Sequence, residues 1–324
     1  MSSTPFTILT GFLGSGKTTL LNRLLRDPRM QQTAVLVNEV GDIGLDHRLI
    51  ESVANDIVLL ESGCVCCSVR DDLPAALASL LSRRRARAVP EFGRIVLETS
   101  GIAVPGPIVQ LVLGDDELAA QLRIEGIVAV VDAWLGLDSL ERHMECAEQV
   151  AMADTLVLSK LDLAPRARVA SLLGRLQRLN GTAPLFFSDG RDLNPVELFA
   201  ATELQTRSAA PAVSHRGEHH AEHAQRFTTF ALCWDAPVEW CEFEAWLEGL
   251  LIARGGDILR LKGLLHVAGR DAPVVVQGVQ HTMYPPRDLP AWPGASPRTE
   301  LSFVTRDFSR TAALRSLVPF FGPR

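Results

Sequence analysis

Lysine is scarce in this chain of 324 residues, which has 32 Lys and Arg residues together but only three lysines, Lys17, Lys160 and Lys262. Acidic residues outnumber the basic ones, 38 to 32, so the formal net charge is −6 at pH 7. A chain with this charge has no general attraction to nucleic acid or to anionic lipid. We therefore expect no nucleic-acid partner.

Long apolar runs are missing as well, although hydrophobic residues make up 47% of the chain. No run reaches the ~18 residues that a membrane-spanning helix needs, and the first residues lack the pattern of a signal peptide. Cysteine is also rare, at six residues, which argues against a disulfide framework and favours thiols or metal ligands. These absences predict a soluble cytoplasmic protein without a membrane partner.

The spacing of the short apolar runs predicts the fold class. Up to about residue 200, runs rich in Val, Ile and Leu alternate with segments of helical period, which is typical of a parallel sheet covered by helices. The strands are expected at residues 6–10, 34–38, 57–61, 95–99, 127–132, 155–159 and 185–188. The helices are expected at residues 18–26, 73–85, 142–153 and 166–179. We therefore predict an α/β nucleotide-binding domain over residues 1–203.

The pattern changes after a stretch rich in Ser, Ala, Pro, Gly and His at residues 204–226, which is expected to be a linker. Four of its histidines would capture metal weakly or simply keep the linker solvated: His215, His219, His220 and His223. Strands are then expected at residues 227–234, 258–267, 274–280 and 300–305, and helices at 240–254 and 310–319. Strands grouped in this way predict a smaller α+β domain over residues 227–324.

A phosphate-binding loop is the most specific motif. Residues 11–18 read GFLGSGKT, which matches G-x-x-x-x-G-K-[ST] between an expected strand and an expected helix. Lys17 would reach the β- and γ-phosphates, and Thr18 would ligate Mg²⁺. The residues expected to contact the phosphates are Gly11, Gly14, Ser15, Gly16, Lys17, Thr18 and Thr19. The motif predicts a P-loop NTPase.

Two acidic segments follow strands of the same domain. Glu98-Thr-Ser-Gly101 ends the strand at 95–99, where the carboxylate would hold the Mg²⁺ hydration shell and the Gly101 N–H would face the γ-phosphate. Glu39, after the second strand, would ligate Mg²⁺, position the attacking water or complete a thiol site, and the sequence does not choose among these roles. Lys17, Glu39 and Glu98 are thus the candidate catalytic residues. Residues 98–101 contain no glutamine to orient water, so we expect slow unassisted hydrolysis.

The identity of the base is indicated by Ser159-Lys160-Leu-Asp162, which comes directly after a buried strand. In the related N-K-x-D pattern the Asp accepts hydrogen bonds from guanine, and adenine would leave that carboxylate without donors. Ser159 stands where the pattern has Asn, and a hydroxyl cannot supply both the donor and the acceptor of an amide. The pattern favours GTP over ATP, and a helix-capping role for Asp162 is the alternative.

Three of the six cysteines, Cys64, Cys66 and Cys67, lie within four residues. Three thiolates in one loop would converge on a tetrahedral metal and leave its fourth position to another ligand, and sulfur ligands favour Zn²⁺ or Cu(I) over Mg²⁺. Such an incomplete site suits metal transfer, while buried structural thiols and a redox dithiol are the alternatives. The remaining cysteines, Cys146, Cys233 and Cys241, are expected to fill the core.

The motifs GFLGSGKTT, NEVGD, CVCC, ETSG and SKLD occur in this order, and with them the chain resembles the CobW-type GTPases over nearly its whole length. Residues 257–263 and 276–281 resemble the C-terminal domain of that family. Ser159 in place of Asn, and Asp42 in place of a frequent Glu, depart from the family pattern.

The resemblance implies a GTP-hydrolysing metallochaperone that delivers zinc, cobalt or iron-type cargo to target enzymes. It also implies that Lys160 and Asp162 hold the guanine, and that Cys64, Cys66 and Cys67 hold the transferred metal. We therefore predict a GTPase that uses GTP and Mg²⁺ and passes Zn²⁺ to a client metalloprotein, with its oligomeric state left open.

Three other functions remain compatible with these motifs. An activation GTPase for a cobalt or iron enzyme, of the cobalamin-synthesis or nitrile hydratase activator type, would use the same residues on another metal. A metal buffer or sensor would use the thiols without coupling them to hydrolysis. A P-loop kinase or ATP-dependent ligase would prefer ATP and release a phosphorylated product.

Overall fold

The computed structural model describes residues 3–37, 58–60, 69–188, 193–203, 227–294 and 296–321. Contacts within the chain divide it into two compact units. The first comprises Met1–Arg175 and Ala183–Gln205, and the second comprises Leu176–Thr182 and Thr206–Arg324. Residues 204–226 lie outside the described residues, so the linker and the exact domain boundaries stay predictions.

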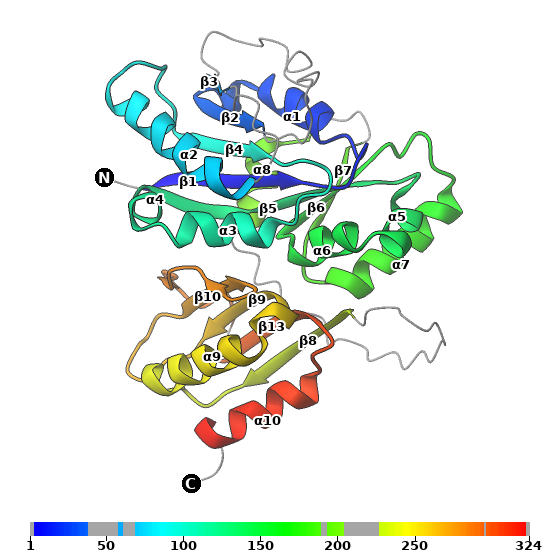
Figure 1. Ribbon diagram of the computed structural model, residues 1–324. Coiled ribbons are helices and arrows are strands. Elements are labelled where there is room, and N and C mark those ends of the chain that lie inside the picture. Colours follow the sequence, from blue (N-terminus) through cyan, green and yellow to red (C-terminus); the bar gives the residue numbers. More distant parts are fainter. Residues whose placement is uncertain are drawn as a thin grey trace. The chain divides into compact units, whose positions relative to one another are not determined.

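The first unit is built on a seven-stranded sheet with the strand order β3-β2-β4-β1-β5-β6-β7 (Figure 1). Every pair of neighbouring strands in it is parallel. The strands are β1 (Thr4–Thr10), β2 (Thr33–Val37), β3 (Val58–Leu60), β4 (Arg94–Glu98), β5 (Leu122–Asp132), β6 (Thr155–Ser159) and β7 (Leu185–Ser188). All residues of β2 and β6 are buried, as the unbroken apolar runs predict for strands covered on both faces.

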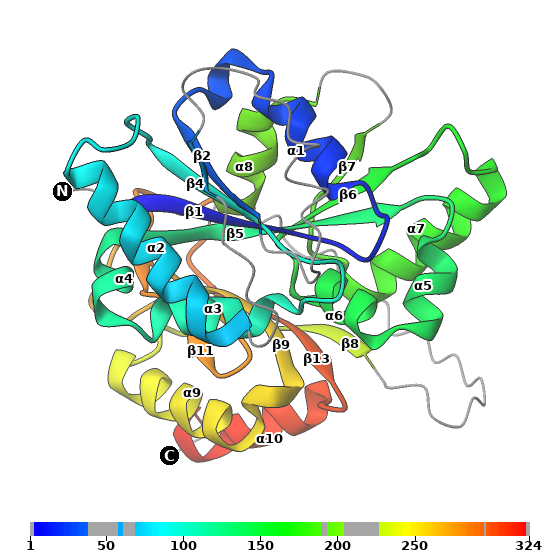
Figure 2. The same cartoon turned by 45° about the horizontal axis from the view of Figure 1, so that its top comes forward.

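Helices cover both faces of this sheet (Figure 2). They are α1 (Lys17–Leu25), α2 (Val69–Arg85), α3 (Pro105–Leu113), α4 (Asp116–Gln121), α5 (Gly136–Arg142), α6 (Met144–Met152), α7 (Arg166–Asn180) and α8 (Pro195–Glu203), with a 3₁₀ turn η1 at Pro28–Met30. One core cluster joins α1 and α8 to the sheet through Leu21, Val96 and Phe199. Within the described residues, no helix combines the length and the apolarity that crossing a bilayer requires.

Several of these helices were not expected from the sequence. Helix α3 reads PGPIVQLVL, and five of its nine residues are buried. A helix that is apolar almost all round shows no amphipathic period, so its pattern resembles that of a buried strand. Despite this omission, the expected fold class, a P-loop-type α/β unit with a parallel sheet, is confirmed.

The second unit contains an antiparallel sheet of six strands in the order β11-β10-β9-β13-β8, with β12 paired to β10. The strands are β8 (Phe227–Trp234), β9 (Ile258–Leu265), β10 (Val274–Val279), β11 (Thr282–Met283), β12 (Arg287–Asp288) and β13 (Thr299–Arg306). Helices α9 (Trp240–Arg254) and α10 (Arg310–Phe321) and a 3₁₀ turn η3 (Gly255–Asp257) complete it. The smaller α+β unit expected from the sequence is confirmed.

The core of the second unit lies between this sheet and the two helices. Phe230 and Phe303 are paired across β8 and β13, and their rings stack with centroids 5.1 Å apart. Trp246 of α9 is 1% exposed and donates from its indole nitrogen to Ser316 Oγ of α10 at 3.0 Å. These contacts join both helices into one apolar layer on the sheet.

Gly263, in the middle of β9, marks the closest packing in this core. A Cβ added there would lie 2.5 Å from Leu301 Cδ2 and 2.7 Å from Val276 Cγ2. Both neighbours are buried, at 0% and 1% exposure, and have little room to move. The neighbouring strands therefore require glycine at this position.

We expect Gly263→Ala to lower the free energy of unfolding by about 1–3 kcal/mol, because overpacking a filled core forces neighbouring side chains out of place. Gly249→Ala is the matched control, since a Cβ on this exposed position of α9 meets nothing within 4 Å. Alanine in a helix should raise the free energy of unfolding there by about 0.5–1 kcal/mol. Denaturant unfolding of the two variants, shifting in opposite directions, is the measurement. Shifts of the same sign would contradict this account of the packing.

Candidate nucleotide-binding site

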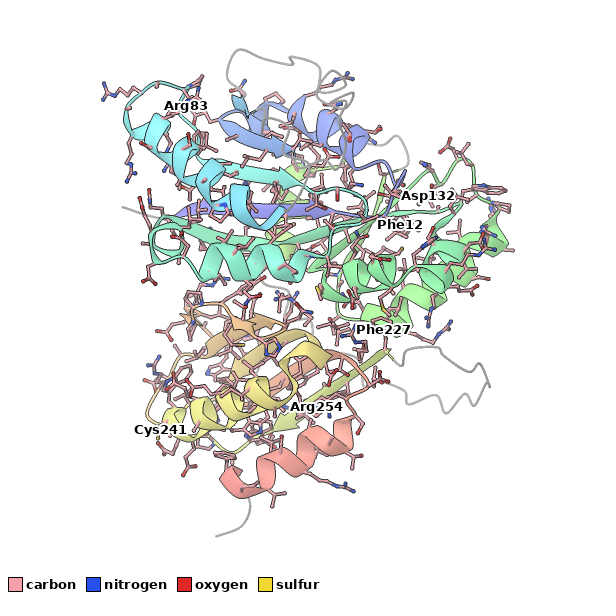
Figure 3. All side chains as sticks on the ribbon, viewed as in Figure 1. Phe12, Arg83, Asp132, Phe227, Cys241 and Arg254 are labelled. Carbon is pink, nitrogen blue, oxygen red and sulfur yellow. The ribbon has the colours of Figure 1, made fainter. Side chains whose placement is uncertain are left out.

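The motifs of the first unit meet at one edge of the parallel sheet. The loops that follow β1, β4, β5 and β6 all leave from the carboxyl ends of adjacent strands. Ligands of open α/β sheets bind at this edge, where the strand order changes direction. Figure 3 shows Phe12 and Asp132, from the loops after β1 and β5, at the same end of the sheet.

The loop after β1 depends on three glycines in unusual backbone conformations. Gly11, Gly14 and Gly16 have φ angles of +146°, +71° and +90°. A Cβ on Gly11 would also lie 2.4 Å from the carbonyl oxygen of Val130 in β5. Gly16 is the N-cap of α1, so the loop leads directly into the positive end of a helix dipole. This arrangement suits an anion such as a phosphate.

Lys17 and Thr18 start α1 and make different contacts. The Lys17 ammonium donates to the carbonyl oxygens of Gly11 at 2.9 Å and Phe12 at 3.3 Å, so the side chain lies along the loop. Thr18 Oγ1 donates to Glu98 Oε1 at 2.5 Å, and Glu98 is only 4% exposed. A hydroxyl and a carboxylate brought together in this way are the hard oxygen ligands that Mg²⁺ prefers, so these residues fit that ion.

The segment after β4 is held by a residue that the sequence analysis missed. Gln149 of α6 is 1% exposed, and its amide nitrogen donates to the carbonyls of Gly101 at 3.0 Å and Ala103 at 2.9 Å. On the other side, a Cβ on Gly101 would lie 2.7 Å from the backbone nitrogen of Leu13 in the phosphate loop. Gly101 is therefore clamped between α6 and the phosphate loop. No sequence pattern signals this, because Gln149 lies 48 positions from Gly101.

The loop after β6 is also hydrogen-bonded to the phosphate loop. Ser159 Oγ donates to the carbonyl oxygen of Ser15 at 2.6 Å. Lys160 Nζ donates to the carbonyl oxygen of Gly14 at 2.6 Å and to Asp132 Oδ2 at 2.7 Å. Lys160 adopts a left-handed conformation with φ +56°, which turns the chain sharply after the strand.

Asp132, at the end of β5, is a second residue that the sequence analysis missed as a site residue. Besides its ion pair with Lys160, it accepts hydrogen bonds from the backbone N–H groups of Trp134 at 2.7 Å and Leu135 at 3.0 Å. It is 7% exposed. An Asp that ends a buried strand and is followed by a turn is a signal that could have suggested this role.

Other predicted site residues lie apart from these contacts or outside the described residues. Asp162 is exposed and makes no hydrogen bond or ion pair with another described residue, and Thr19 is exposed on α1. Glu39, Cys64, Cys66 and Cys67 lie outside the described residues, as do the four linker histidines. Within the described ranges, no three His, Cys, Asp or Glu side chains gather into a group that could hold a metal ion.

The described cysteines correct one expectation. Cys146 is buried in α6, as expected, but Cys233 and Cys241 are exposed and do not fill the core. Cys233 lies on the edge strand β8 between Leu232 and Trp234, and alternation along the strand turns it away from the buried Leu232. Burial, with a smaller effect of the Glu145 carboxylate, raises the pKa of the Cys146 thiol to about 12.

Comparison with known proteins agrees with this geometry. Residues 5–187 match the family described as CobW/HypB/UreG, nucleotide-binding domain, and residues 227–319 match the cobalamin synthesis protein cobW C-terminal domain. The chain is 32% identical over 304 residues to the zinc chaperone YjiA of Escherichia coli, a match that covers 94% of each protein. It is 38% identical over 189 residues to zinc-regulated GTPase metalloprotein activator 1 of Schizosaccharomyces pombe, covering 56% of this chain and 44% of that protein.

A solved structure is similar over both units. It is the crystal structure of a Zn(II)-bound triple mutant of the YjiA GTPase, in which one glutamate and two cysteines are replaced by alanine. The match has a TM-score of 0.73 with 26% sequence identity and covers 99% of both chains. With the phosphate loop, the Thr18–Glu98 contact and both family matches in agreement, the chain belongs to the CobW/HypB/UreG family of P-loop GTPases.

Proposed function

We propose that this protein is a GTP-dependent zinc metallochaperone, which binds zinc through Cys64, Cys66 and Cys67 and passes it to client metalloproteins in the cytoplasm. The observation that carries the proposal is the contact between Thr18 and Glu98 beside the phosphate loop, in a chain similar over nearly its whole length to a protein named a zinc chaperone. This contact joins the start of α1, directly after the phosphate loop, to the end of β4.

Hydrolysis of GTP at this site would produce GDP and phosphate. The oxygen of a water molecule attacks the γ-phosphorus, and the bond from that phosphorus to the bridging oxygen of GDP breaks. Mg²⁺, when bound, would neutralise charge on the phosphate oxygens, with Thr18 and Glu98 holding it or its water ligands. Lys17 would turn from its loop carbonyls to the β- and γ-phosphates, and Gln149 would keep Gly101 in position beside the γ-phosphate.

Guanine recognition is proposed for the loop after β6. Asp162 is exposed at the end of that loop and is open to donors on a base. The Lys160 stem would pack over the base plane while its ammonium stays on Gly14 and Asp132. Ser159 has no amide to offer a base, but the hydrogen bond from its hydroxyl to the Ser15 carbonyl holds the loop after β6 against the phosphate loop.

The register of the sheet supports coupling between the nucleotide and the thiols. Val37, the last residue of β2, is paired with Glu98 of β4, and Leu36 is paired with Leu60 of β3. The end of β2, which Glu39 follows by two positions in the sequence, therefore lies next to Glu98. Cys64 follows the end of β3 by four positions in the sequence, and β3 is parallel to β2. A change at Glu98 on loss of the γ-phosphate would reach both segments through one strand.

The first test is base selectivity. We expect wild-type protein to bind GTP at least tenfold more tightly than ATP, about 1.4 kcal/mol, because Asp162 offers acceptors that match guanine and not adenine. Asp162→Asn should weaken GTP binding and favour xanthosine triphosphate, whose extra oxygen can accept from the new amide. Asp116→Asn, at an exposed position in α4, is the control. Equal affinity of the wild type for ATP and GTP, measured by calorimetry, would refute the assignment.

The second test concerns Gln149, a positioning residue. Gln149→Leu should lower affinity for a non-hydrolysable GTP analogue roughly tenfold and lower kcat, because the buried carbonyl of Gly101 and the half-buried carbonyl of Ala103 lose their donor. GDP affinity should change less than about twofold, since GDP has no γ-phosphate to meet that segment. Gln110→Leu, at an exposed position in α3, is the control. If both nucleotides weaken equally, Gln149 serves only the stability of the unit.

The third test is the zinc coupling itself. Zn²⁺ should be titrated against a chelator with the protein nucleotide-free, GDP-bound and bound to a non-hydrolysable GTP analogue. We expect about one tight site per chain, whose affinity differs at least tenfold between nucleotide states, about 1.4 kcal/mol. By linkage, zinc must change nucleotide affinity by the same factor. Coinciding affinities would leave a zinc buffer or sensor as the better description.

The control for this test must separate the thiols from other zinc ligands, because the YjiA variant with one glutamate and two cysteines replaced is still Zn(II)-bound. Zinc content alone therefore does not report on the thiols. Replacing Cys64, Cys66 and Cys67 together by serine should remove the nucleotide-dependent site, while replacing the exposed Cys233 and Cys241 should leave it unchanged. A triple variant that keeps nucleotide-dependent zinc affinity would place the metal elsewhere.

A further inference from the structure

The second unit contains a groove of about 530 Å³ that neither the proposed GTPase cycle nor the thiols use. Helix α9 forms one wall, and the segment from β11 to Pro286 forms the other. The groove reaches the core, because Phe243, Leu247 and Val276 line it and are each at most 6% exposed. In Figure 3, Cys241 and Arg254 mark the two ends of α9, along which the groove runs.

The groove follows one face of the helix over three turns. The α9 residues that line it recur at helical spacing from Trp240 to Ile252. At 1.5 Å per residue, this face is roughly 18 Å long. Ile252, at one end, is 83% exposed, so a large apolar side chain stands open to solvent beside an apolar groove. Such a surface is typical of a binding site for an apolar partner.

The rim of the groove is acidic. Glu244 and Glu248 are exposed, lie one helical turn apart and both line the groove. Within the described part of the chain, neither carboxylate has an ion-pair partner. Like charges at this spacing destabilise a helix by a few tenths of a kcal/mol. A cationic partner would remove this repulsion.

His281 is the one basic residue in the lining, and within the described residues it forms no ion pair with Glu244 or Glu248. Its Nδ1 lies 3.0 Å from the carbonyl oxygen of Leu251, so Nδ1 must carry the hydrogen and donate. The ring packs against η3, since a Cβ on Gly255 would lie 2.3 Å from Nδ1. His281 is thus hydrogen-bonded to the C-terminal part of α9, and the groove has apolar walls and an acidic rim.

We propose that this groove binds a basic amphipathic helix of a partner protein. Apolar side chains at positions i, i+3 or i+4, and i+7 of the partner would enter the groove, and flanking Lys or Arg would face Glu244 and Glu248. An extended strand fits less well, because the adjacent strand β11 has only two residues to pair with it. This proposal does not depend on GTP hydrolysis or on zinc binding.

The test uses two fluorescein-labelled peptides of about four helical turns. The first carries leucines at i, i+3, i+4 and i+7 with arginines on the flanks, and the second has the same composition in scrambled order. Fluorescence anisotropy with the full chain at physiological ionic strength measures both affinities. We expect the ordered peptide to bind at least tenfold more tightly than the scrambled one, because only the ordered peptide forms an apolar stripe.

Charge reversal on the rim separates this site from general attraction to an acidic protein. Glu244→Lys with Glu248→Lys should lower the affinity for the ordered peptide at least tenfold. Glu141→Lys with Asp271→Lys changes the net charge by the same amount at two exposed positions away from the groove. This control should lower the affinity for the ordered peptide less than about twofold. Equal losses in the two double variants, equal affinity for both peptides, or no binding of either peptide would overturn the proposal.

Discussion

A phosphate loop turns its N–H groups toward an anion more readily when its carbonyl groups are hydrogen-bonded elsewhere. In this protein four side-chain contacts hold carbonyl groups of the loop. The carbonyls of Gly11 and Phe12 accept from Lys17, that of Gly14 accepts from Lys160, and that of Ser15 accepts from Ser159. Two of the three lysines in the chain are used in this way. Lys17 has to leave its carbonyls to reach a phosphate, whereas the contacts from β6 can persist.

The rest of the first unit keeps those donors in place. β1 lies between β4 and β5, and β5 is paired with β6 so that Asp132 is opposite Ser159. Asp132 then holds Lys160, while Glu98 at the end of β4 holds Thr18. Ser159, Asp132 and Glu98 are the last residues of their strands, so their positions depend on strand register, because a slip of one residue would turn each side chain to the other face. The site is a property of the sheet as much as of its loops.

The sequence predicted the parts of this site that are local. The phosphate loop was recognisable because its glycines, Lys17 and Thr18 are contiguous, and the strand–loop–helix order around them is confirmed. Gln149 was missed because its partner Gly101 lies 48 positions away, which no periodicity reveals. The ion pair of Asp132 with Lys160 spans 28 positions and was missed in the same way, although the turn after Asp132 is a local signal. Helix α3 was missed because its sequence is apolar on nearly every side, which removes the amphipathic period. The roles of Glu39 and of the thiol segment stay predictions, since both lie outside the described residues.

The buried Cys146 has a consequence for how metal could be distributed within such a chain. A thiol binds zinc as the thiolate, and burial raises the pKa of the Cys146 thiol to about 12, so this thiol stays protonated at pH 7. The interior of α6 therefore offers zinc no competing sulfur ligand, although it carries one. Desolvation thus makes this cysteine a hydrocarbon-like filler of the core. Burial alone therefore takes this one sulfur out of competition for any metal that reaches the chain.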